Sequence, residues 1–348
     1  MVLKQPHLLE SKNNMSPLLS IIIPAFNVEQ FIEQAICSAQ NQTLKDIEII
    51  VVDDNSTDGT RTVIEALTIT DSRIRIIANT QLNAGQCGAR NAGLWAATGF
   101  YTGFLDGDDY WHPKKAASHI AFMEQHPEVD LTFSRWSVID ETGRETGRVT
   151  DEPRKRTLNL EDLLVENVVG GASNVICRTA ARVTAGDFDL TLKAAVDLDL
   201  WLRIARLRNG NISFINEVLT FYRLREGQIT KDWKRMADNW DIIFDRLRAE
   251  MPDRILPIEN EAKAKHLRYR SYLAYEAGEF PAARQQLVAA FKRGGLSLLA
   301  DRRTWITAAA VLATILPEHF HKAIADAART VRTWVSHRNS VIGTGKAE

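Results

Sequence analysis

The sequence predicts an α/β fold in which a Rossmann-like sheet with helices on both faces is followed by an α-helical C-terminal appendage. As far as about residue 223, short runs rich in β-branched residues alternate with amphipathic stretches, as expected of β-α-β units. After Asp232 the composition turns helical to the end. The chain has 348 residues, which suits two domains or one large domain with an appendage.

The expected elements of the N-terminal half repeat a strand–helix pattern. They run over 18–24 (strand), 29–42 (helix), 47–52 (strand), 61–67 (helix), 74–78 (strand), 87–98 (helix) and 100–105 (strand). The β-branched strand runs are typical of a parallel sheet that is buried on both faces. Farther along, a polar and turn-rich stretch at 139–156 predicts a loop region. The remaining expected elements run over 129–132 (strand), 160–166 (helix), 174–178 (strand), 195–208 (helix) and 213–223 (strand).

Composition and charge exclude several classes of protein. Hydrophobic residues at 45% and charged residues at 25% are ordinary for a globular protein. A formal net charge of -1 gives no electrostatic reason to expect a nucleic acid as partner. Cys37, Cys87 and Cys177 lie far apart without C-x-x-C spacing, so the sequence supports neither a disulfide framework nor a zinc site. A reducing cytoplasm fits this cysteine usage.

No membrane-spanning segment is expected. Residues 1–16 lack the apolar core of a signal peptide, and the longest strongly apolar stretch, 305–316, is too short to cross a bilayer. Because Arg302 and Arg303 precede that stretch, peripheral contact of the C-terminal helices with the inner face of a membrane is one expectation. A helix packed on the body of the protein is the alternative.

An acidic cluster follows the strand expected at 100–105. Asp106 and Asp108 point to the same side if this segment is extended, and Gly107 between them leaves the backbone open to a ligand. Such close carboxylates raise each other's pKa unless a cation lies between them. Mn²⁺ or Mg²⁺ held by one or two carboxylates completes its shell with water and phosphate, so a phosphate-bearing substrate is implied. The alternative is a polar turn.

Several motifs in sequence order carry a resemblance to a known family. They are SIIIPAFN at 20–27, VVDDNSTDGT at 51–60, GARNAG at 88–93, LDGDD at 105–109, GDFD at 186–189 and DLDLWLR at 197–203. Over about residues 18–235 the chain resembles the inverting family 2 glycosyltransferases, whose fold is called GT-A. The resemblance implies a nucleotide-diphospho-sugar donor. The processive members carry Q-x-x-R-W and transmembrane helices, and neither is found in the sequence.

The resemblance assigns a nucleotide pocket to the ends of the first two strands. Pro24, Ala25 and Phe26 would line it, with Phe26 near the base. Asp54 would accept a hydrogen bond from the imide N–H of uracil or its equivalent, because a carboxylate only accepts. The alternatives are an ordinary core position for Phe26 and a turn or helix cap for Asp54.

The resemblance also assigns the diphosphate site. Arg90 would donate to the diphosphate, unless it lies on a solvated helix face. Asp106 and Asp108 would bind the ribose and a Mn²⁺ or Mg²⁺ ion, with the metal chiefly on Asp108 and with Asp109 in support. Arg225 stands where relatives often have a His; it cannot be a neutral imidazole ligand, although it can pair with phosphate.

Asp197 aligns with the general base of the family, which removes the proton from the acceptor hydroxyl. Relatives usually carry Glu immediately before this Asp, whereas this chain has Val196. Asp199 is a rival base, although on a helix its direction differs from that of Asp197 by roughly 200°. The structural alternative for Asp197 is a carboxylate favoured by the helix dipole.

Four regions follow: an N-terminal extension (1–17), a nucleotide-sugar-binding α/β half (18–125), an acceptor-binding half with the catalytic base (126–235) and a helical C-terminal region (236–348). The expected function is transfer of a sugar from a nucleotide donor, with UDP first, to a glycan or lipid-linked acceptor of surface polysaccharide biosynthesis. The alternatives are a catalytically degenerate binding protein and a sugar nucleotidyltransferase. The latter needs a G-x-G-T-R-like loop after the first strand, which is absent here.

Two further patterns are interpreted as structural. Residues 262–293 resemble one tetratricopeptide helix–turn–helix unit, and a single unit predicts a packing appendage rather than a repeat array. His112, His119 and His126 recur every seven residues, which favours a solvated stripe over a metal site.

Overall fold

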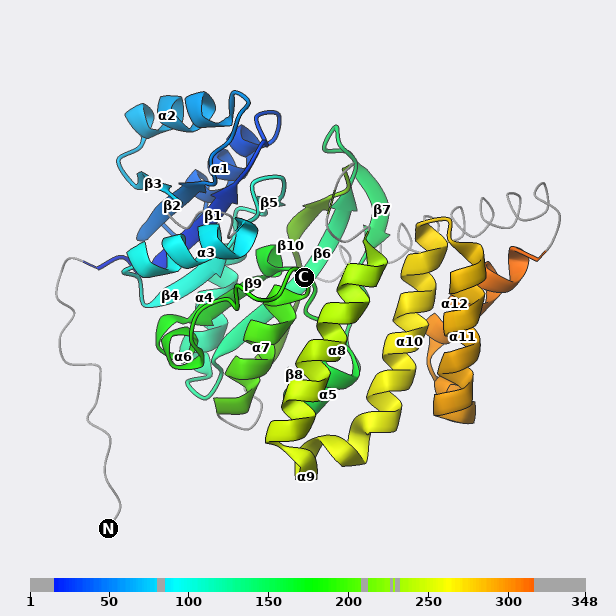
Figure 1. Ribbon diagram of the computed structural model, residues 1–348. Coiled ribbons are helices and arrows are strands. Elements are labelled where there is room, and N and C mark those ends of the chain that lie inside the picture. The colour runs from blue at the N-terminus through cyan, green and yellow to red at the C-terminus, as the bar shows by residue number, and fades with distance from the viewer. Residues whose placement is uncertain (1–15, 80–84, 208–211, 226–227, 229–231, 316–348) are drawn as a thin grey trace, which may run out of the picture.

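The computed structural model describes residues 16–79, 85–207, 212–225, 228 and 232–315. Most of the N-terminal extension and the segment from 316 onward, which includes the basic end of the expected C-terminal helix, lie outside the described residues. Within the described part, one mixed sheet runs through the body, helices cover it, and the C-terminal helices extend to one side (Figure 1). The expected fold class is confirmed.

Ten strands of the described chain form one sheet in the order β3-β2-β1-β4-β9-β6-β10-β5, with β7 paired to β6 and β8 paired to β10. The strands are β1 (Leu19–Ala25), β2 (Ile47–Asp53), β3 (Ile74–Ala78), β4 (Tyr101–Phe104), β5 (Tyr110–Trp111), β6 (Leu131–Ile139), β7 (Glu145–Val149), β8 (Thr157–Leu158), β9 (Val175–Arg178) and β10 (Ile212–Arg223). Strands β1 to β4 are parallel, whereas β9 runs antiparallel to both β4 and β6. The carboxyl ends of the first four strands therefore meet at one edge.

The helices alternate with the strands in the first half and gather at the end of the chain. They are α1 (Ile32–Gln40), α2 (Thr60–Thr70), α3 (Gly85–Ala96), α4 (Lys115–Gln125), α5 (Leu160–Val165), α6 (Thr179–Ala185), α7 (Val196–Leu207), α8 (Trp233–Glu250), α9 (Pro252–Ile255), α10 (Glu259–Glu276), α11 (Phe280–Gly294) and α12 (Arg302–Ala313). Short 3₁₀ segments, including η1 (Ala172–Asn174), join some of them.

Strand β1 shows why this sequence forms a sheet covered on both faces. All seven of its residues are buried. Side chains alternate between faces, so Ile21 and Ile23 pack with Ile32 of α1, while Ile22 packs with Leu94 of α3 on the other side. A run of β-branched residues without polar alternation is what two covered faces require.

Strand β7 is the main element that the sequence pattern missed. Residues 139–156 were expected to form a loop, but Glu145–Val149 pairs antiparallel with β6 as a short edge strand. Its residues are polar and partly exposed, so they carry no apolar alternation that would mark a strand. Pairing with β6 decides its conformation, and the hairpin places this polar strand beside the C-terminal helices.

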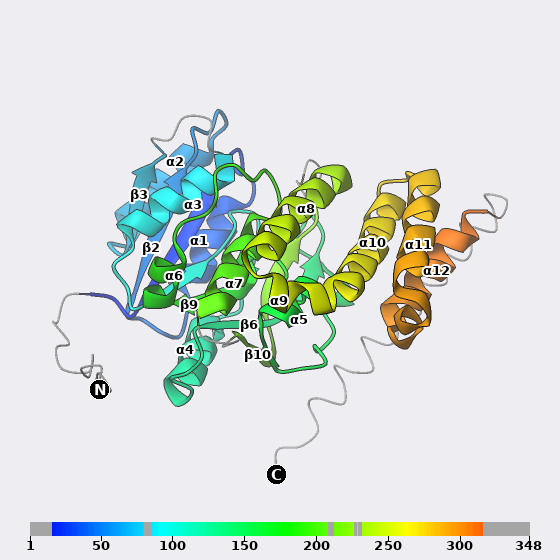
Figure 2. The same cartoon turned by 60° about the horizontal axis from the view of Figure 1, so that its bottom comes forward.

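The C-terminal helices form a hairpin followed by one more helix. Helices α10 and α11 pack along each other, and Gly278 adopts a φ of +76° in the short turn between them, which glycine allows without strain. Figure 2 shows this pair and α12 beside the body, next to α8. Over the described residues, no helix combines the length and the apolar character needed to cross a bilayer.

Candidate functional site

Polar side chains gather where the parallel strands end. Asp54 directly follows β2, and its Oδ1 accepts a 2.6 Å hydrogen bond from Nδ2 of Asn79, which follows β3. The amide of Asp54 also donates to the carbonyl oxygen of Ala25 at 2.8 Å, so the first two strand ends are joined. Phe26 comes next in the chain and is 55% exposed. Phe26 therefore does not occupy the ordinary core position that was its alternative.

The acidic cluster is a turn and not an extended segment. The amide of Asp109 donates to the carbonyl oxygen of Asp106 at 3.0 Å, which closes the chain around Gly107. A Cβ on Gly107 would lie 3.1 Å from the carbonyl oxygen of Pro24 and 3.2 Å from Cδ1 of Ile32. The expectations of an extended segment and of a glycine facing a ligand were therefore wrong. Gly107 permits close packing of the turn against β1 and α1.

Each carboxylate of the turn has its own cationic or hydrogen-bonding partner. Oδ1 of Asp106 lies 2.7 Å from Nη2 of Arg90, and Oδ2 of Asp108 lies 2.6 Å from Nε of Arg225. Asp109 is buried, and its Oδ2 accepts a 2.6 Å bond from the hydroxyl of Ser173. Asp106 and Asp108 are thus partly buried beside their arginine partners, and Asp109 anchors the turn.

Burial and mutual repulsion both raise pKa values in this turn. Burial, followed by the neighbouring charge of Asp106, raises the pKa of Asp108, and Arg225 opposes part of the rise. Burial and the two neighbouring carboxylates raise the pKa of Asp109 well above its ordinary value. A divalent cation would relieve this repulsion, and carboxylate oxygens are suitable ligands for Mg²⁺ and Mn²⁺.

The carboxylates of Asp106 and Asp108 fit a cation that is bound jointly by the protein and by the phosphate of a substrate. Within the described ranges, no three His, Cys, Asp or Glu side chains converge as a metal-binding group. Asp106 and Asp108 would therefore supply the protein ligands, while phosphate and water would complete the shell. Arg225 already occupies one oxygen of Asp108, so a cation and Arg225 compete for this carboxylate. Arg225, which stands where relatives often have a His, thus contacts the carboxylate that was assigned to the metal.

Asp197 lies near the start of α7, and it lines the same cleft as Asp106 and Asp109. Burial raises the pKa of Asp197, and the Arg90 guanidinium opposes part of that rise. Next to it, a Cβ on Gly171 would lie 4.0 Å from Oδ2 of Asp197, so a bare backbone borders this carboxylate. A carboxylate with a raised pKa that faces a cleft has the properties of a general base.

Asp199, the rival base, is engaged elsewhere. Its carboxylate is almost fully buried and lies 2.8 Å from Nη2 of Arg203 and 3.6 Å from Nη1 of Arg246. Val196, where relatives usually have Glu, packs in the main apolar core. The helix turn that separates Asp197 from Asp199 therefore directs one carboxylate to the cleft and the other into a structural ion pair.

Arg90 does not lie on a solvated helix face. Only 3% of its surface is exposed, and its guanidinium lies over the ring of Phe188 with 5.4 Å between Cζ and the ring centroid. Its charge acts on both Asp106 and Asp197, so one buried cation lies within electrostatic reach of both carboxylates. His119, expected on a solvated stripe, is also buried and bonds to the hydroxyl of Thr132 at 2.9 Å.

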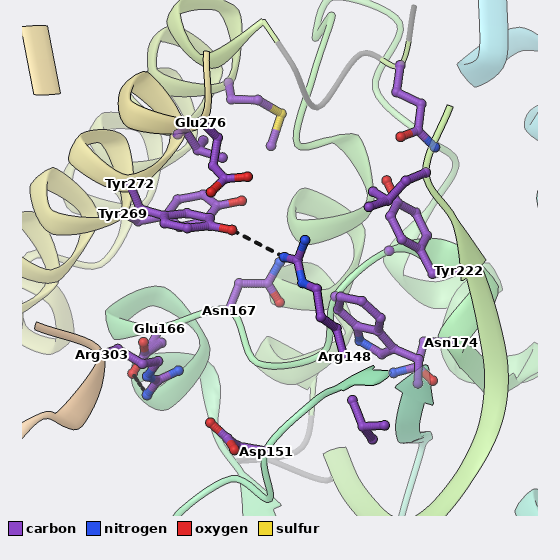
Figure 3. A pocket seen from close by; sticks show the side chains of 18 of the residues that line it. Arg148, Asp151, Glu166, Asn167, Asn174, Tyr222, Tyr269, Tyr272, Glu276 and Arg303 are labelled. Atoms are coloured by element: carbon purple, nitrogen blue, oxygen red, sulfur yellow. Dashed lines mark hydrogen bonds and ion pairs between the residues drawn. The ribbon is translucent and has the colours of Figure 1, made fainter. Parts of the chain in front are cut away.

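The cleft is large and extends well beyond the acidic turn. Its volume is about 1890 Å³, and it continues from Asp106 and Asp197 to helices α10 and α12. Figure 3 shows Tyr269, Tyr272 and Glu276 of α10 projecting into it. The expectation of a packing appendage was therefore incomplete, because α10 forms a wall of the cleft.

Comparison with known proteins decides the family. The model of glycosyl transferase family 2 matches residues 20–182. The UDP-Glc:alpha-D-GlcNAc-diphosphoundecaprenol beta-1,3-glucosyltransferase WfgD of Escherichia coli is 32% identical over 231 residues, which cover 66% of this chain and 86% of WfgD. The chain is a family 2 glycosyltransferase. The nucleotidyltransferase alternative is thereby excluded.

Two further comparisons agree with this assignment of the glycosyltransferase. WfaP of Escherichia coli, whose name specifies the same activity as that of WfgD, is 35% identical over 217 residues, covering 61% of this chain and 80% of WfaP. The mannosyltransferase PcManGT of Pyrobaculum calidifontis, solved with GDP-Man and Mn²⁺, superposes with a TM-score of 0.58 at 19% identity over 92% of this chain and 86% of PcManGT. The latter likeness shows the fold.

Two features of the glycosyltransferase's site were not predicted from the sequence. Ser173 donates to Asp109 and accepts a 3.0 Å bond from the amide of Asp106, so it holds the acidic turn from the far side. The Gly170-Gly171 pair leaves room beside Asp197 and Trp136. A Gly-Gly dipeptide is a sequence signal for unusual backbone, whereas nothing in the sequence marks Ser173.

Proposed function

We propose that this glycosyltransferase inverts the anomeric configuration as it transfers a sugar from a UDP-sugar to a glycan or lipid-linked acceptor of surface polysaccharide biosynthesis. The observation that carries the proposal is the placement of Asp197, whose pKa is raised, in one cleft with Asp106 and Asp109 of the acidic turn. A base and a diphosphate site on one cleft are the two parts that a single displacement requires.

The donor would lie along the strand ends. Pro24, Ala25 and Phe26 would line the nucleotide pocket. Because Phe26 is exposed, its ring is available to contact the nucleobase. Asp54, oriented by Asn79, would accept from the uracil imide. Cytosine has no N–H at this ring position, whereas thymine has the same imide, so Asp54 favours UDP or dTDP, and the UDP-glucose named for WfgD and WfaP puts UDP first.

The diphosphate would lie over the acidic turn. Asp106 would bind the ribose, and Asp106 and Asp108 would hold Mg²⁺ or Mn²⁺, which supplies Lewis-acid neutralisation of the leaving diphosphate. Arg90 and Arg225 now pair with these carboxylates at 2.7 and 2.6 Å, and each can turn part of its guanidinium to phosphate. These two arginines and the carboxylates thus set the charge around the leaving group.

The chemical step requires one proton transfer. Asp197 would take the proton of an acceptor hydroxyl while that oxygen forms a bond to C1 of the sugar. The bond from C1 to the diphosphate oxygen breaks, and its electron pair leaves with UDP. Attack from the face opposite the leaving group inverts C1 in a single displacement. The raised pKa of Asp197 makes it a stronger base than an ordinary carboxylate.

Support for the acceptor class comes from the relatives. The names of WfgD and WfaP specify UDP-glucose and a sugar-diphosphoundecaprenol, which agrees with a UDP-sugar donor and a lipid-linked acceptor. Peripheral membrane contact through the C-terminal helices is part of the same proposal. Arg302 and Arg303 are ion-paired with carboxylates, so the support rests on Trp305, Leu312 and Ile315, which are exposed on and just after α12.

Proton NMR of a transfer reaction tests the proposal. UDP-, GDP- and dTDP-sugars are incubated with a sugar-diphospholipid acceptor and Mn²⁺, and the coupling constant of the new anomeric proton is read. We expect turnover of a UDP-sugar, with α-configured donor giving β-linked product. Retention of configuration, or turnover restricted to GDP- or dTDP-sugars, would contradict the mechanism or the donor, respectively.

A further inference from the structure

Helix α10 places two tyrosines on the cleft that holds Asp197. Tyr269 and Tyr272 are three residues apart, so they lie on one face of the helix. Both project into the cleft (Figure 3), and 39% of Tyr269 is exposed there. Burial, the neighbouring Tyr272 and the charge of Asp197 raise the pKa of Tyr269 to about 12. Tyr269 therefore lies within electrostatic reach of the proposed base, although it belongs to the C-terminal region.

The opposite wall of the cleft is also aromatic. Trp136 of β6 and Tyr222 of β10 meet edge to face with 5.4 Å between ring centroids. Gly170 adopts a φ of +80°, and a Cβ there would lie 2.9 Å from Nε1 of Trp136, so glycine is what lets the indole lie against this loop. Aromatic faces on two walls are suited to the C–H faces of a sugar ring, while the tyrosine hydroxyls can bond to its hydroxyls.

Arg148 of β7 supplies a cation between these walls. Its Nη2 lies 3.3 Å from the hydroxyl of Tyr272 (Figure 3). Within the described part of the chain, no carboxylate lies within ion-pair distance of Arg148, whereas the nearby Arg302 and Arg303 pair with Asp151 and Glu166 at 2.6 Å. A guanidinium that borders the cleft without a counter-ion is a candidate partner for a phosphate.

We propose that α10 and β7 form the acceptor site, in which Tyr269 and Tyr272 hold the acceptor sugar and Arg148 binds the phosphate attached to it. This inference rests on the proposed function and extends it to residues outside the family match at 20–182. The acceptor is then a sugar linked through phosphate, with its free hydroxyl directed to Asp197. The cleft volume of about 1890 Å³ exceeds the roughly 300–1,000 Å³ of a single small-molecule site, so it has room for an acceptor glycan beside the diphosphate end of the donor at Asp106.

Binding measurements without a sugar donor test the site apart from the reaction. The probes are undecyl N-acetylglucosaminyl diphosphate, undecyl N-acetylglucosaminide without phosphate, and inorganic pyrophosphate, each titrated by calorimetry. The variants are Tyr269→Ala, Tyr272→Ala and Arg148→Ala, with Tyr269→Phe and Tyr272→Phe as milder forms. Arg144→Ala is the matched control, because Arg144 is exposed on the same hairpin but does not line the cleft. UDP is titrated into every variant.

We expect the wild type to bind the diphosphate probe at least about tenfold more tightly than the neutral glycoside, as a charge-assisted bond implies. Arg148→Ala should abolish this difference, and each Tyr→Ala change should weaken both glycolipids about tenfold, with Phe intermediate. The affinity for UDP should be the same in every variant as in the wild type. The Arg144→Ala variant should bind both glycolipids as tightly as the wild type does.

Three results overturn the acceptor site. The first is equal affinity of the wild type and the variants for the glycolipids. The second is that neither the wild type nor any variant binds a glycolipid. The third is that pyrophosphate binds as tightly as the diphosphate probe, which would mark a simple phosphate site. The outcome is separate from the proposed function. A protein that binds the probes as expected but turns over no UDP-sugar would retain the acceptor site while losing the proposed reaction.

Discussion

The Nε atom of Arg225 lies 2.6 Å from Oδ2 of Asp108, the carboxylate assigned to the metal. This pair brings a fixed cation to the place where a divalent ion would bind, and the two compete for one carboxylate. Burial raises the pKa of Asp108 even with Arg225 present, so the carboxylate remains short of positive charge. The balance between Arg225 and a metal ion is therefore a property that substitution can shift.

Arg225→Ala should make nucleotide binding more dependent on metal. Without the guanidinium, UDP loses a phosphate partner, and Asp108 becomes free to bind Mn²⁺. We expect UDP affinity without metal to fall about tenfold and the gain on adding Mn²⁺ to rise by a similar factor, as charge-assisted bonds imply. Arg225→His should show a larger gain, and Asp108→Asn should show almost none. Calorimetry with and without Mn²⁺ measures this, and equal metal dependence in all four proteins would refute the competition.

Asp197→Asn and Asp199→Asn should separate catalysis from stability. Asn at 197 keeps size but removes basicity, so transfer should fall by roughly 10²–10⁴-fold with UDP affinity unchanged. Asp199→Asn weakens the buried pair with Arg203 and should lower the free energy of unfolding by about 1–3 kcal/mol with a smaller effect on the rate. Transfer assays and denaturant unfolding provide the two readouts. A fully active Asp197→Asn enzyme would show that the base is placed wrongly.

The raised pKa of Asp197 should appear in the pH dependence of kcat/KM. The base works only when deprotonated, so activity should rise with pH through a midpoint above the ordinary value of an Asp. Arg90→Gln removes the cation that opposes the rise, so it should move this acid limb to higher pH. Arg182→Gln is a control at another buried arginine, one that pairs with Asp187. An acid limb that stays in place in Arg90→Gln would contradict the electrostatic link.

The same shift predicts the sign of a stability change. Because the folded pKa of Asp197 is raised, its ionisation favours unfolding, and stability is lost as pH rises through the interval between the unfolded and folded pKa values. Asp197→Asn should therefore be more stable than wild type at neutral pH and equal to it below the unfolded pKa. Denaturant unfolding at several pH values measures the difference. A variant that is less stable at neutral pH would reverse the assigned direction.

Adjacent glycines offer a matched test of the cleft wall. Gly170→Ala introduces a Cβ at a φ of +80° and 2.9 Å from Trp136, so it should lower the free energy of unfolding by about 1–3 kcal/mol. Gly171→Ala meets no such contact, because its nearest neighbour is Oδ2 of Asp197 at 4.0 Å. We expect Gly171→Ala to keep the melting temperature but to raise the KM for the acceptor. Equal melting temperatures for both variants would argue against the strain at Gly170.

Local patterns were sufficient for the first half of the fold. All residues of β1 except Ser20 are apolar, as two covered faces require, and β2 is apolar between Glu48 and Asp53. Asp54 directly follows β2 and Asp106 lies two residues after β4, so their placement at the same edge of the sheet was foreseeable from the order of elements. The polar strand β7 was not foreseeable, because its conformation depends on pairing with β6 rather than on its own residues.

The sequence by itself determined the α/β class, the position of the acidic cluster after a strand and the choice of Asp197 as the candidate base, because these depend on residues close together along the chain. Only the tertiary structure decided that Arg225 holds Asp108, that Asp199 is engaged by Arg246, and that Tyr269 faces the cleft of Asp197. These contacts join segments distant in sequence, and their geometry follows from how the sheet and the C-terminal helices pack. Neither periodicity nor a motif encodes such a distance.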